Sequence, residues 1–366
     1  MNKRLLTIAM LFLLLCLQSF GYQTKRFVVN GTVTGLKETQ VYLVYMIKDV
    51  EKKDTVALKN GSFVFKGTVN EPCVAMLYNA NHRLQRLFLL DNSEIQINGN
   101  IETPAQIKVT GSKRQFEYEK LQEDIQNNRN KAIEASDKSN KARKVGDTVA
   151  QKRLKIQFDS LYKNEQTIIK SFIKENPNSY LSANQLFFIV VENNLEECKA
   201  LYEPFSPTIK QSFYGKEVAD RFATLERVKI GKPAMDFIQK DTLGNPVQLS
   251  TYKGKYVLLE FWASWCGPCR AEGPNILKAY EKYKDKGLII LAVSLDKDMG
   301  QWKKAIKDDH MPWIHVSDLK YSKSEVANLY GVHAIPANFL ISPEGKIIAK
   351  DLRGKSLNDE LFKLFK

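Results

Sequence analysis

The sequence predicts an α/β C-terminal domain preceded by a β-sandwich-like domain and a helical spacer. Three observations predict this architecture. Residues 22–111 hold short runs of β-forming residues at the spacing of a sandwich. Residues 112–228 switch to helical periodicity and polar composition. Residues 229–366 alternate strand-like and helix-like segments, which is typical of a mixed sheet covered on both faces.

The composition is that of a folded, soluble protein. Of the 366 residues, 43% are hydrophobic and 26% are charged. The formal net charge is +14, but the basic residues are spread over every segment and form no compact run interleaved with aromatic residues. This distribution favours a solvated basic surface and argues against a nucleic-acid partner.

Residues 1–21 have the pattern of a signal peptide. Lys3 and Arg4 form a positive start, a leucine-rich stretch follows, and small residues precede an expected cleavage near Gly21. The apolar run is short for a membrane span of about 20 residues. Export to the periplasm or cell envelope is therefore expected. An uncleaved anchor is one alternative; a lipoprotein at Cys16 is another, disfavoured because leucines rather than small residues precede this cysteine.

The N-terminal domain is expected to be a packing or positioning module, since it contains no acid pair, histidine cluster or glycine-rich phosphate loop. Asn60-Gly61 is a two-residue hairpin signal, which predicts that the strands on either side of it pair with each other. The expected strands are 27–33, 41–45, 55–58, 63–65, 74–78, 87–90, 94–97 and 107–110.

The polar middle segment predicts two long antiparallel helices that meet at residues 145–147. Asn176-Pro177 then stops the second helix, and Ser179 or Ser182 is placed to cap the next one. Residues 181–195 are the most apolar part of the spacer. They predict either a helix buried in the core or a homodimer interface, because both produce the same pattern.

The C-terminal domain is expected to begin with a β-hairpin and to end in a helix. A buried strand, a long helix and a second buried strand follow the hairpin, and an added helix and short strand come next. In chain order the expected elements are the hairpin 237–249, strand 256–262, a helix to about 284, strand 288–294, helix 299–307, strand 313–316, helix 323–330, the hairpin 338–350 and a terminal helix.

The stretch YVLLEFWASWCGPCR, residues 256–270, holds the candidate site. Cys266 and Cys269 stand where a strand buried on both faces meets a helix. Unpaired N–H groups and the helix dipole at this end favour a thiolate on Cys266. Cys269 lies one turn further on, within disulfide reach.

WASWCGPCR resembles the active-site motif of the thioredoxin superfamily. Together with Glu260, Pro274 and residues 331–336, the pattern resembles the periplasmic, membrane-associated thiol–disulfide oxidoreductases of the TlpA/ResA type, over the last third of the chain. The resemblance implies a thioredoxin-like fold and protein-disulfide reduction. By pattern and position, the N-terminal segment resembles the β-domain of unknown function that precedes such domains in many exported proteins.

The resemblance implies roles for the motif residues. Cys266 would attack a substrate disulfide, and Cys269 would resolve the mixed disulfide. Gly267 and Pro268 match the dipeptide of thioredoxin, which favours a reducing potential of about −270 mV. The redox-active disulfide is the only cofactor expected.

Five further residues are implied to support the cysteines. Glu260 matches a buried acid that relays the proton of the resolving cysteine; the alternative is a side chain that reaches solvent. Pro336 matches a cis-proline opposite the disulfide, with Ile335 offering backbone groups to an extended substrate. Trp262 and Trp265 would line the site; the alternative for both is ordinary core packing, which fits Trp262 better than Trp265.

Glu272 and His333 are weaker candidates for modulating the site. Glu272 matches an acid near the disulfide of the cytochrome-maturation branch, but it is equally consistent with a plain surface residue of a helix. His333 lies three residues before Pro336, where a charged ring would tune the thiolate. A loop histidine without a role is the simpler interpretation.

Other chemistries for the cysteine pair are disfavoured. A zinc site needs a second ligand pair, whereas Cys73 and Cys198 are lone cysteines and no histidine pair accompanies them. Their separation gives no geometric reason to pair them with each other. A peroxiredoxin carries a Pro and a Thr or Ser at fixed spacing before its reactive cysteine, and residues 261–265, FWASW, do not match that pattern.

The expected partners are proteins with thiols or disulfides, among which apocytochromes, misoxidised exported proteins and a peroxidase remain open. A membrane thiol-electron donor is implied by the resemblance. The alternative function is a non-catalytic envelope binding or scaffold protein, in which the thioredoxin-like domain is a vestige.

Overall fold

The computed structural model describes residues 26–47 and 50–366. The expected signal peptide, with Cys16, lies outside the described residues. Within the described ranges, no helix combines the length and the apolar character needed to cross a bilayer. The chain divides into two compact units. The N-terminal unit consists of the residues up to 189 and of residues 200–217, and the C-terminal unit consists of residues 190–199 and 218–366. The helices of the expected spacer are shared between the two units.

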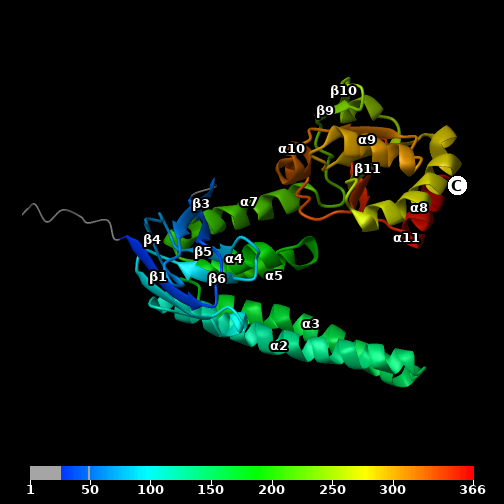
Figure 1. Cartoon of the computed structure of the whole chain (residues 1–366). Helices are drawn as coiled ribbons and strands as arrows, with labels where there is room; N and C mark the ends of the chain where they lie inside the picture. Colours follow the sequence, from blue (N-terminus) through cyan, green and yellow to red (C-terminus); the bar gives the residue numbers. More distant parts are fainter. Residues whose placement is uncertain (1–25, 48–49) are drawn as a thin grey trace, which may run out of the picture. The chain divides into compact units, whose positions relative to one another are not determined.

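Two four-stranded sheets form a sandwich in the N-terminal unit, as Figure 1 shows. Their strand orders are β4-β1-β7-β8 and β3-β2-β5-β6. Along β1, Phe27, Val29 and Val33 alternate into the shared core, while Val28, Asn30 and Thr32 point to the other face. All eight expected strands are confirmed: β1 (Phe27–Thr34), β2 (Gln40–Ile47), β3 (Val50–Ala57), β4 (Ser62–Gly67), β5 (Cys73–Asn79), β6 (Gln85–Leu90), β7 (Glu94–Asn100) and β8 (Lys108–Thr110).

The sequence predicts a β-hairpin at Asn60-Gly61, and this prediction is wrong, because the strands on either side of the turn do not pair with each other. The turn itself forms, because Lys59 and Ser62 exchange backbone hydrogen bonds of 2.9 and 3.0 Å, and both central residues have a left-handed φ. However, β3 pairs with β2 and β4 pairs with β1, so the turn carries the chain from one sheet to the other. Asn60-Gly61 determines the turn, whereas packing of the sandwich determines which strands β3 and β4 pair with.

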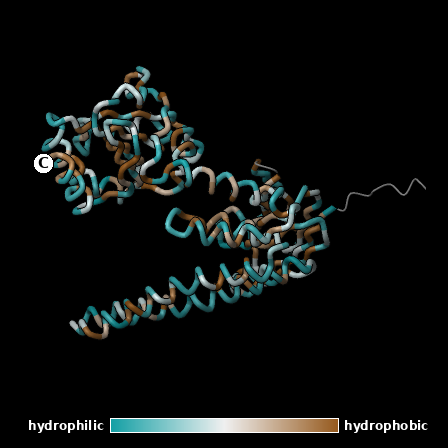
Figure 2. Tube along the Cα trace, turned by 180° about the vertical axis from the view of Figure 1, so that it is seen from behind, coloured by the Kyte–Doolittle hydropathy of each residue, from teal (hydrophilic) through white to brown (hydrophobic). Residues whose placement is uncertain are grey.

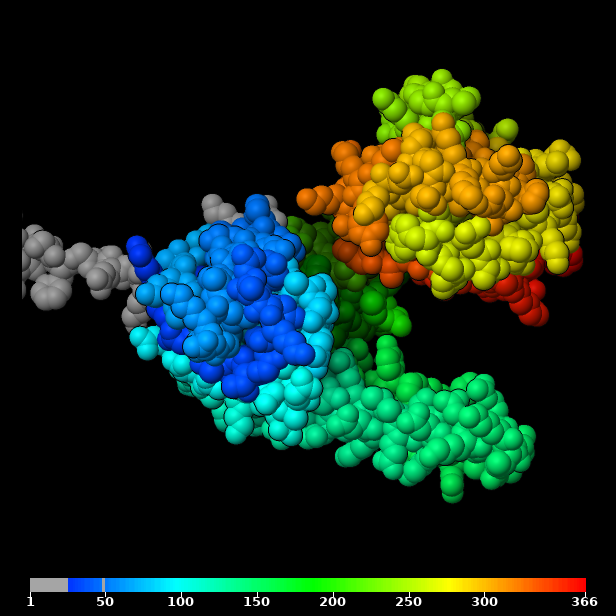
Figure 3. Space-filling view, in the orientation of Figure 1, coloured from blue at the N-terminus to red at the C-terminus, as the bar shows by residue number. Residues whose placement is uncertain are grey.

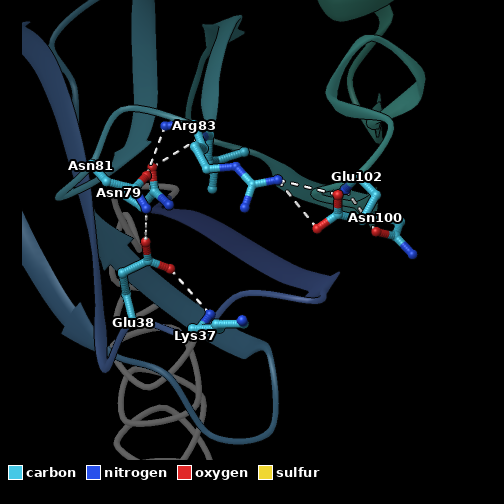
Figure 4. A network of polar contacts seen from close by, with 8 residues as sticks. Lys37, Glu38, Asn79, Asn81, Arg83, Asn100 and Glu102 are labelled. Atoms are coloured by element: carbon cyan, nitrogen blue, oxygen red, sulfur yellow. Dashed lines mark hydrogen bonds and ion pairs between the residues drawn. The ribbon is translucent and has the colours of Figure 1, made fainter.

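Side-chain contacts hold three loops together at one end of the sandwich (Figure 4). Asn81 donates to a carboxylate oxygen of Glu38 at 2.5 Å, which joins the β5–β6 loop to the β1–β2 loop. Arg83 pairs with Glu102 at 3.2 Å, which joins the same loop to the chain after β7. Since these groups are exposed, each contact contributes at most about 1 kcal/mol and mainly orients the loops.

The expected long helices form an antiparallel hairpin of α2 (Lys113–Lys144) and α3 (Thr148–Glu175). It is largely hydrophilic in Figure 2 and extends beyond the sandwich in Figure 3. A buried amide joins the helices, because Asn128 donates to the Leu161 carbonyl at 2.7 Å and accepts from Asn164 at 2.8 Å. The shorter helices that follow are α4 (Tyr180–Ile189), α5 (Leu195–Tyr202), α6 (Pro207–Gln211) and α7 (Phe213–Arg227).

Helix α4 starts as the sequence predicts. The Ser179 hydroxyl accepts a hydrogen bond from the Leu181 N–H at 3.2 Å, so Ser179 is the cap. Leu181, Ala183 and Leu186 are fully buried within the chain. These residues therefore pack inside the protein, whereas Phe188 of the same helix is 65% exposed.

A seven-stranded mixed sheet of order β10-β9-β13-β12-β11-β14-β15 forms the core of the C-terminal unit. The interior strand β11 (Tyr256–Trp262) runs parallel to β12 (Leu288–Ser294) and antiparallel to β14 (Ala337–Ile341). The other strands are β9 (Ile238–Asp241), β10 (Pro246–Gln248), β13 (Ile314–Ser317) and β15 (Ile347–Lys350).

Helices cover both faces of this sheet, as expected for the fold class. Apolar side chains of α8 (Gly267–Tyr283), α9 (Met299–Asp308) and α11 (Lys355–Leu364) pack with one face. Those of α10 (Glu325–Leu329) pack with the other. Every residue of β11 after Tyr256 is buried, which makes it the interior strand that its apolar run predicts.

Gly61→Ala should lower the free energy of unfolding of the N-terminal unit more than Gly146→Ala does. Both glycines have a left-handed φ, of 78° and 74°, so alanine at either position costs roughly 1–2 kcal/mol. At Gly61 the new Cβ would also lie 2.7 Å from the Val33 carbonyl oxygen, whereas nothing lies within 4 Å at Gly146. Urea unfolding followed by circular dichroism measures the loss of unfolding free energy in each variant. Equal losses would show that the contact with the Val33 carbonyl oxygen adds no cost.

Candidate active site

Cys266 and Cys269 form a disulfide at the start of α8, with an S–S distance of 2.04 Å. Cys266 is the N-cap of the helix, and its Sγ accepts a hydrogen bond from the Cys269 N–H at 3.2 Å. The sequence predicts this placement. The two residues are almost equally buried, at 5% and 3% exposed.

Asp296 fixes the loop that leads into Cys266. This buried carboxylate accepts hydrogen bonds from the Ser264 N–H at 2.9 Å and the Ser264 hydroxyl at 2.6 Å, and from the Ser294 hydroxyl at 2.7 Å. The sequence interpretation did not include Asp296. Its position in the sequence could have identified it. An acid just after the carboxyl end of β12 lies at the same edge of the sheet as the carboxyl end of the parallel strand β11.

Glu260 is buried in the middle of β11, so the alternative of a side chain that reaches solvent is wrong. It alternates with Leu258 and Trp262 toward the face where the two cysteines pack. Its Oε2 has no hydrogen-bond partner among the described residues. Burial, and secondarily the negative charge of Glu272, raise the pKa of Glu260 to about 8. The carboxyl group is therefore mostly protonated at pH 7.

Glu272 is tethered rather than a plain surface residue. Its Oε1 accepts hydrogen bonds from the Gly354 N–H at 2.7 Å and from the Asn275 amide at 2.6 Å. These contacts join the first turns of α8 to the loop before α11. Through its charge, Glu272 also favours the protonated form of Glu260.

The peptide bond between Ile335 and Pro336 is cis, as the resemblance predicts. The carbonyl of Pro336 accepts a hydrogen bond from the Arg353 guanidinium group. Asn338, at the start of β14, exchanges hydrogen bonds of 2.8 and 3.0 Å with the backbone of Leu352. The segment after the cis bond is thus anchored to the loop that also holds Glu272.

The two tryptophans of the motif differ in placement. Trp262 is 2% exposed and belongs to the core, which confirms the packing interpretation. Trp265 is 53% exposed, and its ring centroid lies 5.4 Å from that of Tyr321. Gly267 and Pro268 are exposed beside it. Tyr321 was missed in the sequence, because no local motif marks it.

His333 is exposed in the loop before the cis bond. Loss of water around its ring and, secondarily, the positive charge of Arg221 lower the pKa of His333 to about 4. The ring is therefore neutral at pH 7. A neutral ring lacks the charge on which the expected tuning of the thiolate depends.

Neither Cys73 nor Cys198 forms a disulfide. Burial raises the pKa of Cys73 to about 11, so its thiol is protonated and unreactive at neutral pH. Among residues 26–47 and 50–366, no cluster of three or more histidine, cysteine or acidic side chains is arranged to hold a metal ion. Within that range, Cys266 and Cys269 form the one disulfide.

The raised pKa of Glu260 predicts that the oxidised C-terminal unit loses stability as the pH rises. A carboxyl group that binds its proton more tightly when folded stabilises the fold fully below its ordinary pKa of 4.5, and this stabilisation is lost as the pH rises through about 8. Between pH 5 and 8 the free energy of unfolding should fall by up to about 1.4 kcal/mol per pH unit.

Glu260→Gln removes the titrating group and should flatten this slope. Urea unfolding can be followed through the four tryptophans, all of which lie in the C-terminal unit. Identical slopes in the wild type and Glu260→Gln would show that another group is responsible.

Two family models match the chain. Residues 230–350 match the AhpC/TSA family, and residues 27–118 match a domain of unknown function, DUF4369. The second match covers the β-sandwich and the start of α2.

Among solved structures, the thioredoxin domain of a thiol–disulfide oxidoreductase from Bacteroides vulgatus is 40% identical, with a TM-score of 0.36. The match covers 38% of this chain and 99% of that one. A thiol–disulfide oxidoreductase from Bacteroides fragilis is 36% identical, with a TM-score of 0.35 and coverage of 36% and 99%.

Curated relatives include the thiol–disulfide oxidoreductase ResA of Bacillus cereus, 33% identical over 154 residues, which are 42% of this chain and 82% of that protein. ResA of Bacillus subtilis is 35% identical over 127 residues, which are 35% of this chain and 69% of that protein. At this identity and coverage, the chain belongs to the thioredoxin-like thiol–disulfide oxidoreductases related to ResA.

Proposed function

We propose that this protein is an exported protein-disulfide reductase that works through Cys266 and Cys269. The observation that carries the proposal is the position of this pair at the N-terminus of α8, where the Cys269 N–H donates to the Cys266 sulfur. Once the disulfide is reduced, this N–H and the helix dipole stabilise a thiolate on Cys266. Cys266 is therefore the attacking sulfur.

The reaction transfers two electrons from the cysteine pair to the client. The Cys266 thiolate attacks one sulfur of the client disulfide, and the other client sulfur leaves as a thiolate that takes up a proton. Cys269 then loses its proton and attacks Cys266. The second client sulfur is released as a thiol, and the Cys266–Cys269 disulfide remains.

Glu260 is the proposed acceptor of the Cys269 proton, and it acts in its ionised form, which a pKa of about 8 leaves as the minority at pH 7. Its side chain faces the same side of the sheet as the cysteines, and its pKa of about 8 lies near the ordinary pKa of a thiol, about 8.5. A base with a matched pKa exchanges protons with a thiol at little cost in free energy.

The reducing direction and the export are supported by the sequence. Gly267 and Pro268 match the dipeptide of thioredoxin, and residues 1–21 have the pattern of a signal peptide. A reductase in an oxidising compartment needs a supply of electrons. A membrane thiol-electron donor is proposed to re-reduce the disulfide.

Cys266→Ser should abolish insulin reduction by the purified protein with dithiothreitol as electron donor, because serine cannot form the mixed disulfide. Cys73→Ala is the matched control and should reduce insulin at the wild-type rate, since this buried thiol belongs to the N-terminal unit. Equal rates for the wild type and Cys266→Ser would end the proposal and favour the scaffold alternative.

Cys269→Ala should accumulate mixed disulfides with clients in the native host, because the resolving thiol is missing. Non-reducing electrophoresis and mass spectrometry identify the trapped proteins. The double variant Cys266→Ser/Cys269→Ala should trap none. Trapping at the same level in the double variant would show that another sulfur forms the adducts.

A further inference from the structure

The aromatic pair Trp265 and Tyr321 is an exposed apolar surface beside the reactive disulfide. The two residues are 53% and 46% exposed, and their ring centroids lie 5.4 Å apart. Trp265 directly precedes Cys266 in the chain, whereas Tyr321 comes from the loop between β13 and α10. Large aromatic rings left in contact with water are costly unless something covers them, and Tyr and Trp dominate binding surfaces.

The backbone presents Tyr321 in an unfavourable conformation. Its φ is 53°, a left-handed value that a bulky residue seldom adopts, and Leu319 in the same loop has a φ of 55°. Such residues persist only where the surroundings hold them, and they concentrate at functional sites. Here the Asp318 carboxylate accepts hydrogen bonds from the N–H groups of Lys320, at 3.1 Å, and Glu325, at 2.8 Å, which clamps the loop on both sides of Tyr321.

The two segments that carry the rings are anchored at the same residue of β12. On one side, the Ser294 hydroxyl donates to Asp296, which holds Ser264 next to Trp265. On the other side, the Ser294 carbonyl accepts from the Ser317 hydroxyl at 2.8 Å. The same Ser317 oxygen accepts from the N–H of Leu319 at 3.1 Å, two residues before Tyr321. Since both loops are anchored at Ser294, the backbone segments that carry the two rings are held beside each other before any partner arrives.

We propose that Tyr321, together with Trp265, binds an apolar or aromatic side chain next to the client's cysteine, and so selects which disulfides are reduced. The proposal rests on the proposed function, because it assigns the substrate class of the same site. The occupant is a client segment because the surface adjoins the attacking sulfur, so a side chain held there brings its neighbouring cysteine to Cys266. Pre-organised rings bind with little loss of conformational entropy.

The test uses two peptides of the same length that differ only after the cysteine, in Phe or Ser, each linked by a disulfide to a fluorescent reporter. The wild type should prefer the Phe peptide in kcat/KM. Tyr321→Ala should lower this preference about fivefold, mainly by raising KM for the Phe peptide. Tyr321→Phe should keep it. Phe362→Ala removes another exposed ring, on α11, and should match the wild type.

An unchanged ratio between the two peptides in Tyr321→Ala would overturn the proposal, and so would an equal fall for both. Failure of the proposed function is separable, because in that case the wild type reduces neither peptide. Binding of the same peptides with alkylated cysteines, measured by isothermal titration calorimetry, then tests the surface separately. The Phe peptide should bind more tightly than the Ser peptide, and Tyr321→Ala should remove the difference. A dimer that depends on Tyr321 in light scattering would assign the surface to a second copy and overturn the proposal.

Discussion

Burial of β11 on both faces is the constraint on which the reactive end of this protein depends. The strand lies inside the seven-stranded sheet, between β12 and β14, so its carboxyl end cannot shift without disturbing both neighbours. Cys266 follows that end after three residues and starts α8. The position of the reactive sulfur is therefore set by the core of the sheet rather than by the loop that carries it.

The same burial gives Glu260 its chemistry. A carboxyl group on a central strand loses its water, and here no described residue replaces that water at Oε2. Its negative form is therefore costly, and the proton affinity rises until it resembles that of a thiol. Tethering of Glu272 to the backbone of Gly354 adds a fixed negative charge that acts in the same direction.

The parts of this structure that are encoded locally could be predicted from the sequence. Alternating and continuous apolar runs predicted the strands, and the spacing of Cys266 and Cys269 at the mouth of a helix predicted their disulfide. Pairing depends on distant partners, and for that reason the turn at Asn60-Gly61 was right while its hairpin was wrong. Asp296 and Tyr321 reach the site only through folding of the chain, so no motif marks them.

The burial of Cys73 has a consequence for a protein built to exchange disulfides. In such a protein, any other thiol of the same chain that becomes a thiolate could attack the Cys266–Cys269 disulfide in place of a client. With a pKa of about 11, only roughly one Cys73 side chain in a thousand is ionised at pH 8, and the residue is almost entirely covered. Packing in the sandwich thus slows any attack by this sulfur on the Cys266–Cys269 bond, and it does so without any change to the reactive pair.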